Sequence, residues 1–103
     1  MAEIKIFWTN TAVKQRNSIF EYWNERNNRT RYSKKLNTLI KERLKVLKTN
    51  PDIGKRTEFV NTRAISLGHY SIFYQIIESQ IFIISFWDNR QYPVKLLKFL
   101  KKK

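Results

Sequence analysis

The chain of 103 residues is 42% apolar, so it is long enough for one small folded domain and too apolar for a disordered segment. It contains no cysteine, which excludes disulfide bonds and thiolate metal sites. Its 21 Lys and Arg residues against 8 Asp and Glu residues give a formal net charge of +13. A field of this strength favours nucleic acid, the ribosome or an acidic protein as the partner.

The first half of the chain has the pattern of one strand followed by two helices. Residues 3–8 alternate between apolar and polar types, as in a half-buried strand. The side-chain oxygens of residues 9–11 can cap a helix that continues to about Asn27. The polar segment 27–30 ends this helix, and Ser33 can cap a second helix over residues 34–48.

The second half has the pattern of three strands joined by tight turns. Residues 50–54, Asn-Pro-Asp-Ile-Gly, end the second helix and turn the chain. We expect strands at about residues 58–67, 70–77 and 80–87, with turns at residues 68–69 and 78–79. Residues 94–100 fit a short helix that has its apolar side chains on one side and its lysines on the other.

This order of elements predicts an α+β fold. It combines an N-terminal strand, a helical hairpin and a three-strand antiparallel meander with a short C-terminal helix. The two helices should cover one face of the sheet. The first strand should pair with the later ones, because a lone strand is not stable. We therefore expect a single domain over residues 1–103, whose other sheet face is open to a ligand or partner.

Nothing in the pattern suggests a membrane protein. The longest apolar run, residues 81–87, is too short to span a bilayer, and residues 2–8 lack the apolar region of a signal peptide. We therefore expect a cytoplasmic protein that needs no membrane, no metal and no small-molecule cofactor.

A series of short motifs runs along most of the chain. In order, they are Trp8 with Ala12 and Ile19, Leu47-x3-Pro51-x2-Gly54, Arg63, Tyr-Ser-Ile-Phe-Tyr at residues 70–74, and Phe-Trp-Asp-Asn-Arg-Gln-x-Pro at residues 86–93. Together, over residues 4 to about 100, they resemble the RelE/ParE superfamily, the toxins of bacterial type II toxin–antitoxin pairs. The resemblance implies a toxin that a cognate antitoxin neutralises. Such antitoxins are usually acidic where they wrap the toxin, which suits the net charge of +13.

The same resemblance leaves two activities to distinguish. RelE-like members cut mRNA in the ribosomal A site, and ParE-like members inhibit DNA gyrase. RNA cleavage needs a base, an acid and cations, and RelE-like toxins place Lys and Arg on the middle strands for this purpose. Here Ser71 follows Tyr70 where an Arg is expected, and Thr62 and Ala64 stand where basic residues are expected. These departures favour a ParE-like toxin. A ribosome-dependent mRNA endoribonuclease and a non-toxic member that only forms partner and DNA complexes are the alternatives.

The candidate site residues follow from the charge pattern and from the abrupt end of the last strand, where an apolar run passes directly into polar residues. The predicted target-binding residues are Arg63, Trp87, Asp88, Arg90 and Gln91. If the protein is a nuclease, its acid–base set is His69, Arg90 and Tyr92. The predicted antitoxin-binding residues are the basic stripe Lys34, Lys41, Lys45 and Lys48 and the apolar face Leu96, Leu97, Phe99 and Leu100.

Several of these residues also have a purely structural interpretation. His69 fits a solvated turn, and Arg63 fits an ion pair with Asp88 or Glu58. The lysine stripe is equally consistent with a solvated helix face or with a surface that follows phosphates. Arg16 and Arg43 fall near the middle of their helices' apolar stripes, and the sequence offers no account of them.

Overall fold

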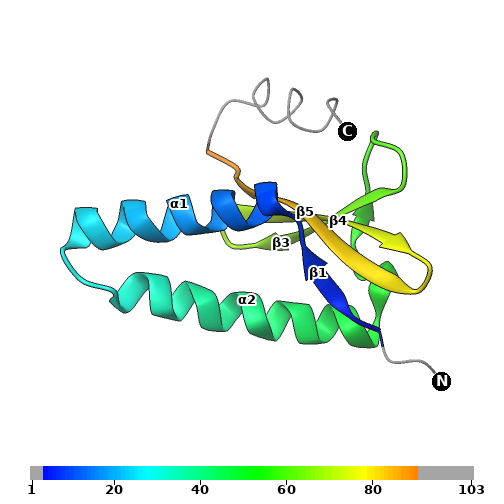
Figure 1. The fold of residues 1–103 in the computed structure, drawn as a ribbon, viewed down its shortest axis with the longest axis horizontal. Coiled ribbons are helices and arrows are strands. Elements are labelled where there is room, and N and C mark those ends of the chain that lie inside the picture. The colour runs from blue at the N-terminus through cyan, green and yellow to red at the C-terminus, as the bar shows by residue number, and fades with distance from the viewer. Residues whose placement is uncertain (1–3, 91–103) are drawn as a thin grey trace.

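The computed structural model describes residues 4–90 of the chain. Helices α1 (Asn10–Asn27) and α2 (Arg31–Thr49) lie side by side as a hairpin against a single five-stranded sheet (Figure 1). The predicted α+β fold, with a strand, two helices and then a meander, is confirmed. The helix predicted over residues 94–100 lies outside the described residues.

The sheet has the order β1-β5-β4-β3-β2, so the first strand of the chain lies beside the last. The β1–β5 pair is parallel, and the other pairs are antiparallel. The two-residue strand β2, which follows the short 3-10 helix η1 (Pro51–Ile53), was not predicted. The strand bounds are β1 (Ile6–Trp8), β2 (Lys55–Arg56), β3 (Thr62–Leu67), β4 (Tyr70–Ile77) and β5 (Gln80–Asp88).

The start of α1 agrees with the prediction, whereas the start of α2 does not. The Thr9 side chain accepts a hydrogen bond from the backbone N–H of Ala12 and caps α1. Ser33 does not cap α2, because the helix already begins at Arg31. The buried Ser33 hydroxyl instead donates to the Asn24 side chain (2.6 Å) and lies 3.0 Å from the Thr30 carbonyl oxygen, so it ties the two helices together.

Strand β3 is shorter than predicted because a side-chain-stabilised turn occupies residues 57–61. The Thr57 hydroxyl donates to the Thr62 carbonyl oxygen (2.9 Å) and accepts from the Phe59 backbone N–H (3.1 Å). Asn61 has a left-handed backbone (φ 54°), a conformation that asparagine tolerates better than most residues. Such local hydrogen bonds compete with strand formation, so regular pairing starts only at Thr62.

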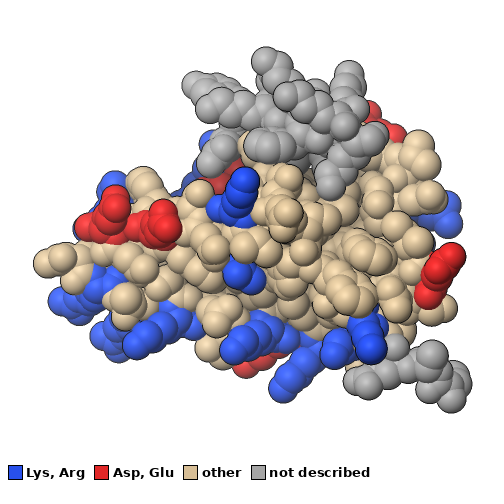
Figure 2. Space-filling view, in the orientation of Figure 1, with Lys and Arg blue, Asp and Glu red and all other residues tan. Residues whose placement is uncertain are grey.

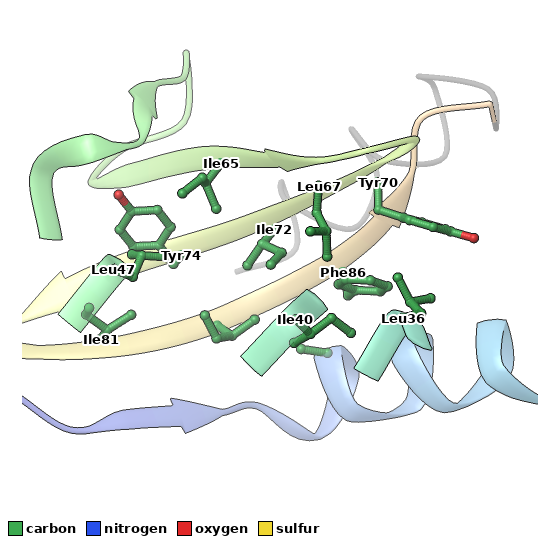
Figure 3. Packing of buried hydrophobic residues seen from close by; sticks show 12 residues of the cluster. Leu36, Ile40, Leu47, Ile65, Leu67, Tyr70, Ile72, Tyr74, Ile81 and Phe86 are labelled. Carbon is green, nitrogen blue, oxygen red and sulfur yellow. The ribbon is translucent and has the colours of Figure 1, made fainter. Parts of the chain in front are cut away.

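The main core lies between the helical hairpin and one face of the sheet (Figure 3). Its helical members come from the apolar stripes that the sequence predicts, and its sheet members alternate along β3 and β4. The buried residues are Ala12, Leu36, Ile40, Leu47, Ile65, Leu67, Tyr70, Ile72, Tyr74, Ile81, Ile83 and Phe86.

A β-bulge decides which side chains of β5 face the helices. The register between β4 and β5 shifts between Phe73 and Tyr74, so that Ile84 has no partner in the ladder. Ile81 and Ile83 join the main core before the bulge, and Phe86 joins it afterwards, which reverses the alternation. The same reversal places Asp88 on the side of the helices, which matters for the site described below.

The second face of the sheet is not the open platform that we expected. Phe73, Ile84 and Trp87 form a separate buried cluster, and Phe59 and Phe82 pack against it. Trp87 does point away from the main core, as its alternation with Phe86 requires, but it is only 5% exposed. An apolar cluster of this kind gains more by packing than by remaining available to solvent.

Candidate partner-binding site at the end of strand β5

Five residues from four elements meet where β5 ends, and we call them the strand-end cluster. Strand pairing brings Tyr70, the first residue of β4, opposite Asp88, the last residue of β5. The backbone N–H of Asn89 donates to the carbonyl oxygen of His69 (2.8 Å), which extends this pairing past the strand. The members are Trp23 from α1, Tyr32 from α2, Tyr70 from β4, Asp88 from β5, and Arg90 just after it.

Asp88 and Arg90 form a two-pronged ion pair. Arg90 Nε donates to Asp88 Oδ1 and Arg90 Nη2 donates to Asp88 Oδ2, each at 2.9 Å, and the Arg90 backbone N–H donates to the same carboxylate. The hydrogen bond from Arg90 lowers the pKa of Asp88, and the carboxylate in turn raises the pKa of Arg90. Both groups therefore remain charged near neutral pH. The carboxylate holds the guanidinium in one orientation.

That orientation places the guanidinium over two aromatic rings. Arg90 Cζ lies 5.7 Å from the Trp23 ring centroid and 5.9 Å from the Tyr70 ring centroid, within range of a cation–π interaction. Trp23 Nε1 donates to the Tyr70 hydroxyl (3.0 Å), and the Tyr32 hydroxyl lies 3.3 Å from it. Burial, followed by the hydrogen bond to Tyr32, raises the pKa of Tyr70 to about 12, so the hydroxyl stays neutral.

A cavity of about 910 Å³ opens between α1 and the end of β5, and we call it the α1–β5 groove. Its lining combines apolar side chains with three cations, Lys14, Arg26 and Arg90. It also includes one carboxylate, Asp88, which is paired with Arg90. The described residues that line it are Thr11, Lys14, Gln15, Ser18, Ile19, Tyr22, Trp23, Arg26, Phe86, Trp87, Asp88 and Arg90.

Gln15 connects this groove to the sheet and leaves one donor unused. Its Oε1 accepts from the Ser85 hydroxyl (3.0 Å) and from the Phe86 backbone N–H (2.9 Å). Its Nε2 is buried and has no hydrogen-bond partner among residues 4–90. A buried donor without a partner costs free energy. A binding partner that places a hydrogen-bond acceptor next to Gln15 Nε2 would remove this cost, which would favour its binding.

Arg63 lies near the other end of the sheet and contacts the main chain. Its guanidinium donates to the carbonyl oxygens of Asp52 (3.1 Å) and Gly54 (2.8 Å). Its ionic partner is Asp52, at 3.7 Å, and not Asp88 or Glu58 as we had considered from the sequence. These contacts fix the turn after α2, and they place Arg63 apart from the strand-end cluster.

The nuclease set is only partly within the described residues. His69 is exposed in the β3–β4 turn, close enough to Asp88 to lower that carboxyl's pKa slightly. Arg90 is engaged by Asp88, and Tyr92 lies outside the described residues. Gln91, Leu96, Leu97, Phe99 and Leu100 also lie outside them.

The basic stripe of α2 is present as predicted. Lys34, Lys41, Lys45 and Lys48 are exposed, and the lower edge of the molecule, which α2 forms, is mostly blue in Figure 2. Over residues 31–49 the helix also carries Arg31, Lys35 and Arg43 but only one carboxylate, Glu42. This edge is therefore strongly positive.

Sequence reasoning did not find the part of the site that α1 contributes. The sequence does not distinguish Trp23 and Gln15 from ordinary helix residues. Their hydrogen bonds join them to residues that are 47 and about 70 positions away along the chain, and such long-range pairing leaves no local pattern. Arg16 is now explained, since its guanidinium lies 4.7 Å from the Trp8 ring centroid and covers the edge of the core. For Arg43 the structure shows partial burial on α2 and no more.

Residues 4–90 contain neither a cluster of metal-ligand side chains nor a membrane-spanning helix. No three His, Asp or Glu side chains gather there as metal ligands would. Neither long helix in that range is apolar enough to cross a bilayer.

The fold and the site together define a small basic α+β protein with a grooved helix–sheet edge, and a solved structure shares this fold. It is a chain of the structure described as the chromosomal ParDE toxin–antitoxin system from P. aeruginosa. The two chains superpose with a TM-score of 0.70 at 19% sequence identity, and the match covers 82% of this chain and 94% of that chain. Residues 6–93 match the family described as ParE toxin of type II toxin-antitoxin system, parDE. The chain belongs to this ParE toxin family. Comparison with curated proteins gives no match.

Proposed function

We propose that this protein is a toxin that inhibits DNA gyrase by binding it, and that a cognate acidic antitoxin neutralises it. The observation that carries the proposal is the match to the ParE family over residues 6–93. The solved relative was determined as a ParDE toxin–antitoxin system, which supports an antitoxin partner for this chain as well.

The side chains on the middle strands favour a binding function over RNA cleavage. The Thr62 hydroxyl donates to the Val60 carbonyl oxygen and accepts from the Gln75 side chain, and the Ser71 hydroxyl donates to the Asn89 side chain. Ala64 packs against the second apolar cluster. These positions hold neutral groups with local structural contacts. A cleavage site would need cations there to stabilise the charge that develops on the phosphate.

The strand-end cluster is our candidate for the target contact. The Arg90 side chain is 47% exposed and is held in place by Asp88, so it can present a fixed cation to a carboxylate or phosphate of the target. Trp87 is too buried to offer much surface, and Gln91 lies outside the described residues. Arg63 holds the turn after α2 and lies apart from this cluster, so it is not part of the proposed contact.

The antitoxin contact is proposed to combine charge and apolar surface. The stripe Lys34, Lys41, Lys45 and Lys48 attracts an acidic segment, and the apolar residues Leu96, Leu97, Phe99 and Leu100 are proposed to hold it. Added salt should therefore slow association more than it speeds dissociation, because screening acts on long-range attraction. A salt effect carried mainly by the dissociation rate would contradict this division.

Two assays test the function. The protein is expressed in a bacterial host with and without the gene that lies next to its own, which serves as the candidate antitoxin gene. Only the culture that lacks this second gene should stop growing. Purified protein should then block gyrase supercoiling and leave mRNA on programmed ribosomes intact. Normal growth with the protein confirmed present would overturn the toxin role. If mRNA is cleaved in the ribosomal A site and gyrase supercoiling is unaffected, the proposed function would be wrong, and the protein would be an mRNA endoribonuclease.

A further inference from the structure

We infer that the exposed basic side of α2, together with the tip of the helical hairpin, binds the phosphate backbone of duplex DNA. We call this surface the hairpin–α2 face. It goes beyond gyrase inhibition and antitoxin binding, because neither of them requires this chain to contact DNA. The residues of the face are the basic stripe Lys34, Lys41, Lys45 and Lys48 and the hairpin residues Arg29, Arg31 and Lys35.

The cations of this face are exposed and are not neutralised by the protein itself. The two ion pairs within residues 4–90 are Arg63–Asp52 and Arg90–Asp88, and neither involves the face. Glu42 is the one carboxylate on α2. The lower edge of the molecule, which α2 forms, is accordingly mostly blue in Figure 2. A surface with charges of one sign along one helix attracts a polyanion.

A cavity at the tip of the hairpin supplies a second observation. It has a volume of about 460 Å³, and its described lining residues are Asn27, Arg29, Arg31, Tyr32 and Lys35. Three of these five side chains are cations, and none is a carboxylate. Arginine and lysine side chains that converge on one hollow are the usual partners of a phosphate group.

The spacing of the stripe suits a regular row of phosphates. At about 100° per residue, its four lysines lie within about 60° of the helix circumference. From Lys34 to Lys48 they span about 21 Å along the axis, at about 1.5 Å per residue. Over that length each strand of duplex DNA carries about six phosphates. The helix can therefore bring several ammonium groups to one DNA strand at the same time.

The stripe lacks the apolar side chains that would hold a folded protein. The exposed apolar residues of α2 are Leu39 (40% exposed) and Val46 (42%), and both lie more than about 90° away from the stripe around the helix. Protein interfaces depend on buried aromatic and apolar anchors, whereas contacts to a DNA backbone depend on cations. The stripe can thus attract an acidic antitoxin segment over a distance, but by direct contact it is better suited to hold DNA.

The face suits duplex DNA better than a single strand. Proteins that bind single strands stack the bases on free aromatic rings. The aromatic residue at the hairpin cavity is Tyr32, and its ring already packs against Trp23 with centroids 4.9 Å apart. Its hydroxyl lies 3.3 Å from that of Tyr70. With this ring engaged, the face offers contacts to phosphates and not to bases.

Contact with DNA would help a gyrase inhibitor to reach its target. Gyrase holds duplex DNA while it changes the supercoiling, so a DNA-bound toxin is concentrated near the enzyme. This consequence rests on the proposed function, whereas the DNA contact itself does not. The test therefore uses DNA alone.

Two triple variants with the same net charge test the assignment. The α2 variant combines Lys41→Gln, Lys45→Gln and Lys48→Gln in the stripe. The control variant removes three exposed cations from α1 and β2 by Lys14→Gln, Lys55→Gln and Arg56→Gln. Binding of each purified protein to a fluorescent duplex of about 20 base pairs is measured by anisotropy between about 50 and 200 mM salt.

The wild-type affinity should fall steeply with salt, because phosphate contacts release counterions. We expect a slope of about −4 or steeper in a plot of the logarithm of the binding constant against the logarithm of the salt concentration. The α2 variant should bind at least about tenfold more weakly at low salt, with a slope that is smaller by about 3. The control variant should change the affinity by less than about threefold. Both should keep the wild-type melting temperature within a few degrees, because the substituted side chains are exposed.

A substitution with the opposite effect covers the case in which a triple variant folds poorly. Glu42→Gln removes the carboxylate of α2 and should tighten DNA binding by about threefold, whereas Glu58→Gln, in the turn before β3, should not. Equal weakening in the two triple variants would mean that net charge alone binds DNA, and it would overturn the inference. Wild-type affinity in the α2 variant, or no duplex binding by the wild type at low salt, would also overturn it. If the α2 variant loses only antitoxin association, the face belongs to the protein partner and not to DNA.

Discussion

Strand β4 carries a buried tyrosine near each end of its inner face, and the two hydroxyls are used in different ways. The Tyr74 hydroxyl donates to the Pro51 carbonyl oxygen (2.7 Å) and accepts from the Gly54 backbone N–H (2.9 Å). The Tyr70 hydroxyl instead meets two side chains, Trp23 and Tyr32. At the Tyr74 end of the sheet the hydroxyl is therefore held by main-chain groups. At the Tyr70 end it is held by side chains, which can rearrange.

The charged pairs differ in the same way. Arg63 binds two main-chain carbonyl oxygens and only distantly approaches Asp52, whose side chain is 77% exposed. Arg90 binds no described main-chain carbonyl and is held by Asp88, whose side chain is 16% exposed. We therefore expect the Tyr74 end to serve stability, whereas the Tyr70 end carries the residues that we propose for the target contact.

We expect the largest loss of stability from a substitution that adds an atom next to the Tyr74 ring. A Cβ at Gly54 would overlap the Tyr74 ring, whose Cε1 and Cζ atoms lie 2.7 and 2.9 Å from the position that it would take. Gly54→Ala must displace the ring from the main chain, so we expect a loss of about 3 kcal/mol in the free energy of unfolding. For a domain of this size the melting temperature should fall by more than about 10 °C.

Gly68 provides the matched control at the other end of β4. It has a left-handed backbone (φ 61°), and a Cβ there would have no atom within 4 Å. Gly68→Ala should therefore cost only the backbone strain, about 1 kcal/mol. Equal losses in the two variants, measured by urea unfolding, would contradict the difference between the two ends.

The next effect compares the two hydroxyls directly. Tyr74→Phe leaves a buried N–H of Gly54 and the Pro51 carbonyl oxygen without this partner, so we expect a loss of about 2 kcal/mol. Tyr70→Phe affects only partly buried side-chain donors, which can turn to solvent, and should cost about 1 kcal/mol or less. Equilibrium unfolding of both variants measures the difference. A greater loss in Tyr70→Phe would reverse our assignment of the structural end.

The two arginines should separate stability from activity. Arg63→Ala removes charged hydrogen bonds to two carbonyl oxygens and should cost about 2 kcal/mol. Arg90→Ala removes a half-exposed ion pair and should cost about 1 kcal/mol or less, yet it should abolish growth inhibition. Melting temperatures and plate toxicity measure both. Retained toxicity in a folded Arg90→Ala protein would remove the strand-end cluster from the mechanism.

Local patterns were enough to predict most of the fold. The apolar stripes of α1 and α2 and the turns at residues 68–69 and 78–79 placed the main elements, because each depends on neighbours in the chain. Ser33 was wrongly predicted to cap α2, and residues 58–61 were wrongly predicted as strand, because the Ser33 and Thr57 hydroxyls form hydrogen bonds that the local pattern does not indicate. The bulge at Ile84 was not predicted, since a bulge is defined by the partner strand and not by the strand itself.

The site was only half visible in the sequence. The polar run that begins at the end of β5 identified Asp88 and Arg90, because polar residues directly after a buried apolar run stand out locally. Their aromatic partners, Trp23 and Tyr32, come from the helical hairpin, and long-range pairing with Tyr70 leaves no local signal. The Arg63 contacts were missed for the same reason, as they depend on where the turn after α2 lies.

The smallest predicted effect is a pH dependence that belongs to one end only. The hydrogen bond from Arg90 lowers the pKa of Asp88, so the folded state favours the carboxylate. Its stabilisation is present above the unfolded pKa of about 3.9, and it is lost as the pH falls through the lower folded-state pKa. Asp88→Asn should be less stable than wild type by about 1 kcal/mol near neutral pH. The difference should shrink as the pH falls below about 4 and disappear once the pH is below the folded-state pKa of Asp88. Asp52→Asn is the control, because its exposed carboxylate lies 3.7 Å from Arg63 and should give little difference at any pH. Urea unfolding across this range measures both. A gap between wild type and Asp88→Asn that persists in acid would mean that the contribution of Asp88 to stability does not depend on its charge.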